Sequence, residues 1–480
     1  MRDLVLLGLL PIMLYAMAQR PFIAVGMWLW TALFFPNGWV YGIAGALRYN
    51  LVFAAVAILG YLFWKHKPKV QLTGLGVGVL LFFLWTIGST ITGIGNHDVA
   101  WEIWSRFAKV VALFVFVVLV IKDKLHLDFI LWCTVLSVGF YADLEALKFL
   151  ASGGGHNIVG MSGHVLGDRN ELSLAFVMVL PICYYLWVEY GKQSRLISLG
   201  LLGTMAMLVI GVIGTQSRGG FVALAVLGCY LFIKSERKIL LGILILALGI
   251  GISYVVSSEW TARIDTIAEA DEDASFIGRV VAWKLSFILA MQHPFFGGGF
   301  KSLETFSVWS DLSRDFFSYP WFYTGTGLPN TQVARAAHSV YFQVMGEQGF
   351  GGLFLYLCCL ASAFFKAGAI ARRAKRAGAP SWLPTMATMI QLSIFAFALG
   401  GAALSFAYVD LIFCLFGLVL VIEKRLLPAT LAEMAQNQGA LTARPDSVPA
   451  PASTSIPPSA PLQPAHARTV SASTIASQHV

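Results

Sequence analysis

Two arginines stand beside predicted helix ends, where the sequence favours anion binding. Arg218 lies between two apolar runs, and Arg279 follows Gly278 just ahead of an apolar-periodic run. A helix N-terminus offers free backbone N–H groups and the positive end of the helix dipole. The forked, permanently charged guanidinium adds donors that suit phosphate oxygens. We therefore predict that Arg218 and Arg279 together hold a diphosphate.

Each arginine also has a simpler interpretation. Arg218 at a membrane edge can extend its head towards lipid headgroups. Arg279 can pair on the surface with the acidic stretch from Glu269 to Asp273. The pair carries more weight than either residue alone, because two cations on one side of a membrane can neutralise the same leaving group.

His338 lies where a long polar loop returns to an apolar run. Imidazole titrates near neutral pH and serves as a general base in many enzymes. If the helix already includes His338, then Arg335 and Tyr341 share its face, whereas Glu347 lies off that face. A single histidine is more often structural, so its position alone does not establish catalysis.

Asp168 and Asn170 precede another apolar run. Residues of these types cap helix N-termini, and contacts to an acceptor or a sugar are the alternative. Asp168 with His156 and His164 matches no established metal-ligand spacing, so we predict no metal and no cofactor. All six cysteines fall inside apolar runs, which predicts neither a disulfide nor a cysteine metal site.

The elements that must position these residues are membrane helices. Of the 480 residues, 58% are hydrophobic and only 12% are charged, and the mean hydropathy is +0.74. That balance excludes an ordinary soluble enzyme, a disordered chain and a disulfide scaffold. Runs of about 20 apolar residues predict an all-α polytopic membrane protein with about 12 transmembrane helices. The clearest helices are expected at 48–64, 72–94, 107–121, 127–149, 170–189, 196–214, 220–233, 239–256, 339–365, 384–403 and 407–422.

The net charge of +8 predicts an orientation and not a nucleic-acid partner. The basic residues form short clusters between apolar runs, which is typical of cytoplasmic loops. The N-terminal helices (1–256) and the C-terminal helices (339–425) then flank a large, packed, outward loop at 257–338. Residues 435–480, rich in Ala, Pro, Ser and Thr, are predicted to be a disordered cytoplasmic tail.

The path of residues 3–47 stays open at this stage. Pro21 and Pro36, together with several glycines, favour a broken or re-entrant arrangement over three short crossings. Ala16-Met17-Ala18 mimics a signal-peptide cleavage site. The apolar sequence resumes at once from Phe22, so an uncleaved first helix is favoured.

An ordered set of short motifs resembles the bacterial O-antigen ligase and O-antigen polymerase superfamily. The motifs follow the family order across about 160–425. They are Asp168-Arg169-Asn170, Leu180-Pro181, Ser217-Arg218-Gly219-Gly220, Gly278-Arg279 with Trp283, Pro294 with Gly297-Gly298-Gly299-Phe300, His338-Ser339-Val340-Tyr341, and Glu347-Gln348-Gly349 with Gly351. One departure is Ser339, where many relatives have Asn. The N-terminal region also looks like that of ligases associated with exosortase-type gene sets.

The resemblance implies a GT-C-like glycosyltransferase that works at the periplasmic face of the bacterial inner membrane. Its donor is a glycan on undecaprenyl pyrophosphate, its acceptor is the lipid A-core, and transfer is metal-independent and inverting. Carried onto this chain, Arg218 and Arg279 bind the pyrophosphate and His338 takes the acceptor proton. Arg335, Tyr341, Asp168 and Asn170 are expected either to contact the acceptor or to support the residues that bind the substrates.

Three other functions compete with an O-antigen ligase. A polymerase or a protein O-oligosaccharyltransferase uses the same donor chemistry, so the site residues do not separate them from a ligase. A transporter typically carries inverted repeats and paired broken helices at the midplane, and neither pattern is visible in the sequence.

Overall fold

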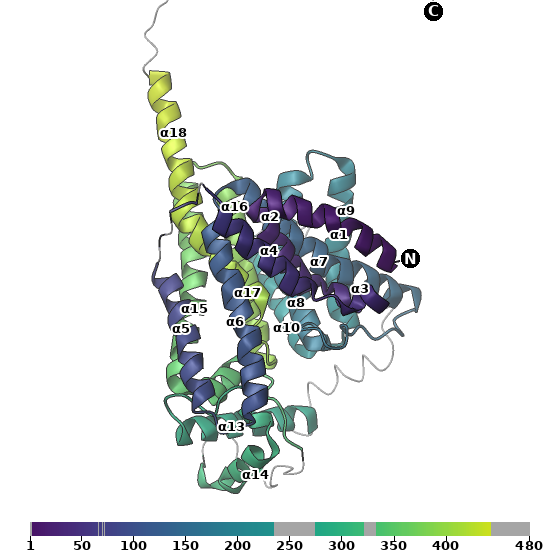
Figure 1. The fold of residues 1–480 in the computed structure, drawn as a ribbon, viewed down its shortest axis with the longest axis vertical. Helices are drawn as coiled ribbons and strands as arrows, with labels where there is room; N and C mark the ends of the chain where they lie inside the picture. The colour runs from purple at the N-terminus through teal and green to yellow at the C-terminus, as the bar shows by residue number, and fades with distance from the viewer. Residues whose placement is uncertain are drawn as a thin grey trace, which may run out of the picture. The chain divides into compact units, whose positions relative to one another are not determined.

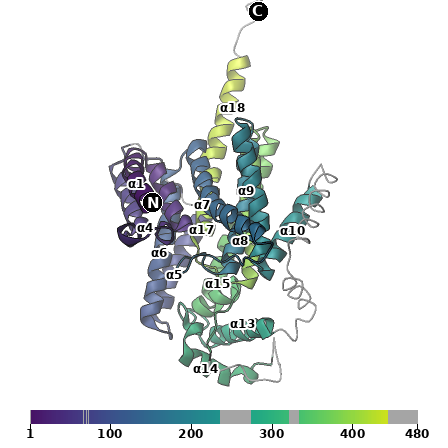
Figure 2. The same ribbon diagram turned by 90° about the vertical axis from the view of Figure 1, so that its right-hand side faces the viewer.

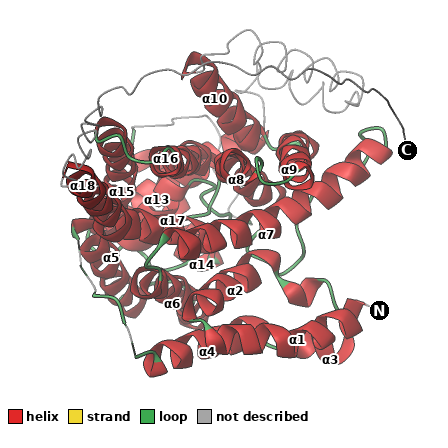
Figure 3. Cartoon of the chain, turned by 90° about the horizontal axis from the view of Figure 1, so that it is seen from above, coloured by secondary structure: helices red, strands yellow, loops and turns green. Residues whose placement is uncertain are grey.

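The computed structural model describes residues 2–65, 67–69, 71, 73–234, 274–320 and 333–442. Over these ranges the chain forms helices and loops without strands, which confirms the all-α class (Figure 3). Eight described helices are long and apolar enough to cross a membrane, and three apolar helices are shorter. The chain is therefore a multi-pass membrane protein. The predicted helix at 239–256 lies outside the described residues, so the total of about 12 crossings stays a prediction.

The helices follow one another along the chain with short connections. In order they are α1 (Arg2–Gln19), α2 (Pro21–Phe34), η1 (Pro36–Gly38), α3 (Gly42–Ala46), α4 (Tyr49–Phe63), α5 (Gly74–Ile91), α6 (His97–Val120), α7 (Lys124–Ala151), α8 (Arg169–Tyr190), α9 (Arg195–Gly214), α10 (Arg218–Lys234), α13 (Ala274–Gln292), η2 (Ser302–Glu304), α14 (Phe306–Arg314), η3 (Phe316–Ser318), α15 (Val340–Arg376), α16 (Trp382–Gly400), η4 (Gly401–Ala403), α17 (Asp410–Val421), η5 (Ile422–Leu426) and α18 (Leu427–Thr442).

Two helices are longer than their apolar runs predicted. Helix α6 begins at His97, ten residues before the expected start at 107. The Asn96 side chain caps it by accepting hydrogen bonds from the backbone N–H groups of Asp98 (3.0 Å) and Val99 (3.2 Å). Helix α15 continues through the basic cluster to Arg376, because Ala, Lys and Arg are strong helix formers whatever their polarity.

The N-terminal region has the broken arrangement favoured by its prolines. Arg20 is extended (φ −139°, ψ 106°), and Pro21 opens α2 after it. Phe35 adopts a left-handed conformation (φ 51°) ahead of the short turn that starts at Pro36. Proline fits the first helical turn because that turn has no internal partner for the missing N–H.

Helix α17 lies in the middle of the bundle. Every residue from Leu411 to Val421 is buried. A helix that is apolar on all sides can lie in lipid or among other helices. Here other helices cover it, because α17 packs against α6, α16, α15, α2 and α5. Helix α8 is buried over most of its length and packs against α9, α10 and α16, and α15 packs against α5 and α16 (Figures 1 and 2).

The described part of the predicted outward loop has a hydrophobic cluster of its own. Helix α13 and helix α14 lie together at one end of α5 and α15 (Figures 1 and 2). Trp309 and Phe316 are buried against α13 residues such as Leu285 and Leu289. We name residues 274–320 the cap.

The described residues up to Met434 belong to one compact unit. Residues 435–442, part of the tail predicted to be disordered, continue helix α18 as far as Thr442. The remainder of that tail lies outside the described residues.

Candidate active site

Helix α15 is interrupted, and a turn of the cap binds at the interruption. Gly349 has φ 69° and ψ −175°, which no helix contains. Three backbone hydrogen bonds of 2.9 Å join the two segments: Gly298 N–H to Gly346 O, Gly299 N–H to Glu347 O, and Phe350 N–H to Pro294 O. The turn that follows the end of α13 at Gln292 is therefore the point at which the cap attaches to the membrane helices.

Glu347 lies at this interruption with its carboxylate buried. Its Oε1 accepts a hydrogen bond from the backbone N–H of Lys301 (3.0 Å), and its Oε2 accepts one from the Tyr408 hydroxyl (2.7 Å). Its backbone carbonyl, which accepts the Gly299 N–H, also accepts a hydrogen bond from the Ser89 hydroxyl (2.7 Å). One residue thus joins the cap, α5, α15 and the segment before α17.

His338 lies before α15 and not on it. The helix begins at Val340, Ser339 is extended, and His338 has φ 47°. The prediction that Arg335, His338 and Tyr341 share one helix face is therefore wrong. The reason is tertiary: the Ser405 hydroxyl accepts the backbone N–H of His338 (2.9 Å), while the Tyr341 hydroxyl donates to the Ala398 carbonyl on α16.

Charged residues from four parts of the chain act on His338. Burial lowers the pKa of the imidazole below its usual value, and the positive charges of Arg279 and Arg335 lower that pKa further. The carboxylates of Asp168 and Glu304 oppose this shift. The net effect favours neutral imidazole, which is the form that can accept a proton.

Arg218 occupies the expected helix N-terminus. It is the first residue of α10, and the preceding Ser217 hydroxyl donates to the Asn170 side chain (2.8 Å). Asp168 caps α8 by accepting from the Asn170 backbone N–H (2.8 Å), which confirms the capping interpretation. A Cβ at Gly220 would overlap the Ser173 hydroxyl, so glycine is needed where α10 meets α8. The starts of α8 and α10 are therefore adjacent.

Arg279 lies in the second turn of its helix and not at its start. Helix α13 begins at Ala274, earlier than the apolar run indicated. The dipole argument is therefore weaker for Arg279 than for Arg218, because the dipole effect is confined to the first turn. Arg335 packs beside it: a Cβ at Gly278 would lie 2.5 Å from Arg335 Nη1. Residues 269–273, the alternative partner of Arg279, lie outside the described residues.

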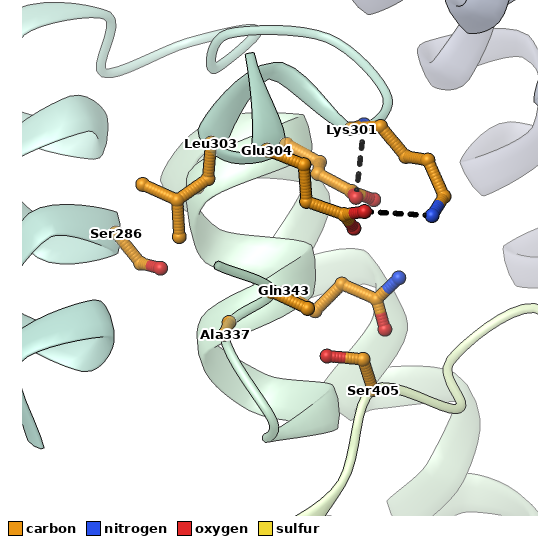
Figure 4. Close-up of a pocket in the computed structure, with 10 residues that line it drawn as sticks. Ser286, Lys301, Leu303, Glu304, Ala337, Gln343 and Ser405 are labelled. Carbon is orange, nitrogen blue, oxygen red and sulfur yellow. Dashed lines mark hydrogen bonds and ion pairs between the residues drawn. The ribbon is translucent and has the colours of Figure 1, made fainter. Parts of the chain in front are cut away.

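A small polar hollow lies between the cap and the start of α15 (Figure 4). Lys301 and Glu304 form one side, with their side chains paired at 2.8 Å, and Gln343 and Ser405 form the other. The hollow adjoins His338, because Ala337, which precedes His338 in the chain, lines it together with Ser405, which accepts the His338 N–H. The hollow brings polar groups of the cap and of the membrane helices next to the predicted base.

The two other histidines considered for a metal site have separate partners. His156 Nε2 pairs with Glu145 Oε2 at 2.7 Å, and His164 Nε2 contacts the Ala32 carbonyl at 2.8 Å. Across the described ranges no group of three or more His, Cys, Asp or Glu side chains could hold a metal ion.

Sequence reasoning missed the roles of Glu347, Tyr408 and Ser405. A signal was present for Glu347: it follows Gly346 within an apolar run, and an ionisable residue in such a run usually has a partner and a function. No local pattern marks Ser405 or Tyr408, because their partners are about 60 or more residues away.

Comparison with known proteins divides the chain into two matched regions. Residues 1–191 match a family of unknown function (DUF5935), and residues 202–357 match the family described as O-antigen ligase. No curated protein matches the chain. The second match contains Arg218, Arg279, His338 and Glu347. Residues 202–357 are therefore similar to the O-antigen ligase family, as the motifs in this stretch predicted.

Proposed function

We propose that the protein is an O-antigen ligase. It transfers a glycan from undecaprenyl pyrophosphate to a sugar hydroxyl of the lipid A-core. The observation that carries the proposal is that the stretch similar to the O-antigen ligase family holds Arg218, Arg279 and His338, and that the charges of Arg279 and Arg335 act on His338. A base beside an anion site is the arrangement that a displacement at a sugar carbon requires.

Arg218 and Arg279 bind the pyrophosphate of the donor. Pyrophosphate departs readily only if its developing negative charge is neutralised. The N–H groups at the start of α10 add to the charge of Arg218. In this scheme the guanidinium groups supply the positive charge at the leaving group, and no step requires a metal ion.

His338 is the general base. The acceptor hydroxyl gives its proton to the neutral imidazole as its oxygen attacks the anomeric carbon, and the bond to pyrophosphate breaks on the opposite face. Attack from the opposite face inverts the anomeric centre. We assign contacts with the two substrates to Asp168 and Asn170, at the start of α8, and to Arg335, beside Arg279.

We assign the reaction to the periplasmic face of the inner membrane. The basic clusters favour a cytoplasmic side for residues 65–70, 122–126 and 190–195, and the cap is then expected on the opposite side. The cap precedes the last membrane helices, which favours a ligase over a polymerase of the same superfamily.

A deletion strain complemented with the wild-type or the His338→Gln chain tests the proposal. Its lipopolysaccharide is separated by gel electrophoresis, and its lipid-linked glycan is extracted and measured. Loss of a ligase gives rough core while long lipid-linked polymer accumulates. A core carrying a single repeat identifies a polymerase, and an unchanged ladder with loss of glycan from proteins identifies a protein O-oligosaccharyltransferase.

A further inference from the structure

Residues 404–409, between η4 and α17, form a non-helical segment that is held by burial and hydrogen bonds. Leu404, Phe406, Ala407 and Val409 are all buried. The Ala407 N–H donates to the Gln343 side chain (3.3 Å), and the Ala407 carbonyl accepts from the Tyr356 hydroxyl (3.1 Å). The segment is thus fixed to α15 through both backbone and side-chain groups.

The same segment is fixed a third time through Tyr408. Its hydroxyl donates to Glu347 Oε2 at 2.7 Å, and the other oxygen of that carboxylate accepts the Lys301 N–H of the cap. Gln343 and Glu347 are one helical turn apart on α15. Two neighbouring polar side chains of one helix therefore hold the 404–409 segment, and one of them also holds the cap.

At its start the segment holds the backbone of His338. Ser405 Oγ accepts the His338 N–H at 2.9 Å. His338 has φ 47°, which is uncommon for residues other than glycine. Such a conformation persists only where surrounding contacts determine it, and it often marks a functional position. On the other side Val340 packs against Gly401, where a Cβ would lie 3.0 Å from Val340 Cγ2.

We propose that Ser405 is a positioning residue for His338. The 404–409 segment, held by Gln343 and Glu347, fixes the left-handed backbone of His338 and thereby aims its imidazole at the acceptor hydroxyl. The inference rests on the proposed function, because it requires His338 to be the base. It adds that a segment far along the chain sets the geometry of that base.

The test uses the full-length protein in lipid nanodiscs, with glycan-linked undecaprenyl pyrophosphate as donor and rough lipopolysaccharide as acceptor. Ser405→Ala removes the acceptor of the His338 N–H and is expected to lower kcat about 10- to 100-fold, the scale of a 1 Å misplacement. The KM for the donor is expected to stay within about twofold of the wild-type value, because the arginines hold the pyrophosphate. Ser405→Thr keeps the hydroxyl and is expected to recover most of kcat.

Two further variants complete the design. Tyr408→Phe removes the hydroxyl that Glu347 accepts but keeps the ring, so a smaller, several-fold fall in kcat with an unchanged donor KM is expected. Ser393→Ala is the matched control, because this buried serine on α16 donates only to its own helix, to the Met389 carbonyl at 3.1 Å. Its kcat is expected to equal that of the wild type.

Each outcome decides the matter. The positioning role is overturned if Tyr408→Phe, and Ser405→Ala where that protein inserts into the membrane, both keep the wild-type kcat. It is also overturned if Ser405→Ala lowers kcat and Ser405→Thr lowers it as much. If Ser405→Ala does not insert, Tyr408→Phe decides alone. His338→Gln is assayed in parallel. Wild-type activity of that variant removes the base and the proposed mechanism with it, whereas loss of its activity beside an active Ser405→Ala overturns the positioning inference alone.

Discussion

Gly349→Ala tests whether the interruption of α15 holds the site together. Gly349 has φ 69° and ψ −175°, a combination that is essentially restricted to glycine. A Cβ at this position would overlap the Phe295 carbonyl oxygen and lie 2.7 Å from the Phe295 carbonyl carbon and 2.8 Å from the Gly297 nitrogen. All three are backbone atoms, so no side chain can rotate away to make room.

The expected loss of stability has two parts. Forcing alanine into this backbone region costs about 1–3 kcal/mol. Displacing a tightly packed backbone costs about another 1–3 kcal/mol. The sum, about 2–6 kcal/mol, is a large fraction of the stability of a typical domain. The turn around Gly298 would move off α15, and the carboxylate of Glu347 would lose its Lys301 partner.

Gly378→Ala is the matched control. Gly378 also has positive φ (67°), but nothing lies within 4 Å of a Cβ there. This variant therefore bears only the conformational cost, about 1–2 kcal/mol. Thermal unfolding of the detergent-solubilised proteins, followed by intrinsic tryptophan fluorescence, measures both variants, and glycan transfer is assayed on each. The reasoning is refuted if Gly349→Ala unfolds at the same temperature as Gly378→Ala and keeps wild-type activity.

Three further predictions concern the chemistry of the site. Arg218→Ala and Arg279→Ala are each expected to lower transfer by about a hundredfold or more while the protein still inserts. Lys at either position is expected to restore only part of the activity, because an ammonium lacks the forked donors of a guanidinium. Full activity at normal abundance in both Ala variants would mean that these residues only contact headgroups or the surface. The acidic limb of the pH–rate profile is expected below the ordinary histidine pKa of about 6.5, because burial and Arg279 lower the pKa of His338 and activity is lost as pH falls through this lowered pKa. Asp168→Asn removes a charge that raises the pKa of His338, so it should move the limb to still lower pH. A shift of the limb to higher pH would contradict the assignment of His338 as the base. Transfer by the purified protein is expected to continue in excess chelator, and loss of turnover that magnesium or manganese restores would refute the metal-free mechanism.

The amino-acid sequence determines where the helices lie along the chain and on which side of the membrane the loops between them are expected. Apolar runs and basic clusters can be recognised in short stretches of sequence, and a helix makes its backbone hydrogen bonds within itself. The bounds of α8, α9 and α16 are therefore close to the predicted ones. The caps are local as well, which is why Asp168 was recognised as one. The start of α6 was predicted too late, because hydropathy marks only the apolar part of a helix and the first turns of α6 are polar.

Only the tertiary structure decides how the predicted site residues are oriented. Helical periodicity assigned His338 to the face of Tyr341, yet the backbone N–H of His338 donates a hydrogen bond to a serine 67 residues away, and the helix begins only after this turn. In the same way, periodicity did not pair Glu347 with any partner, and its partners come from the cap and from the segment before α17. The physical reason is that a local pattern records what a residue offers to its own helix. A buried polar group must instead be satisfied by whichever segment the fold places beside it.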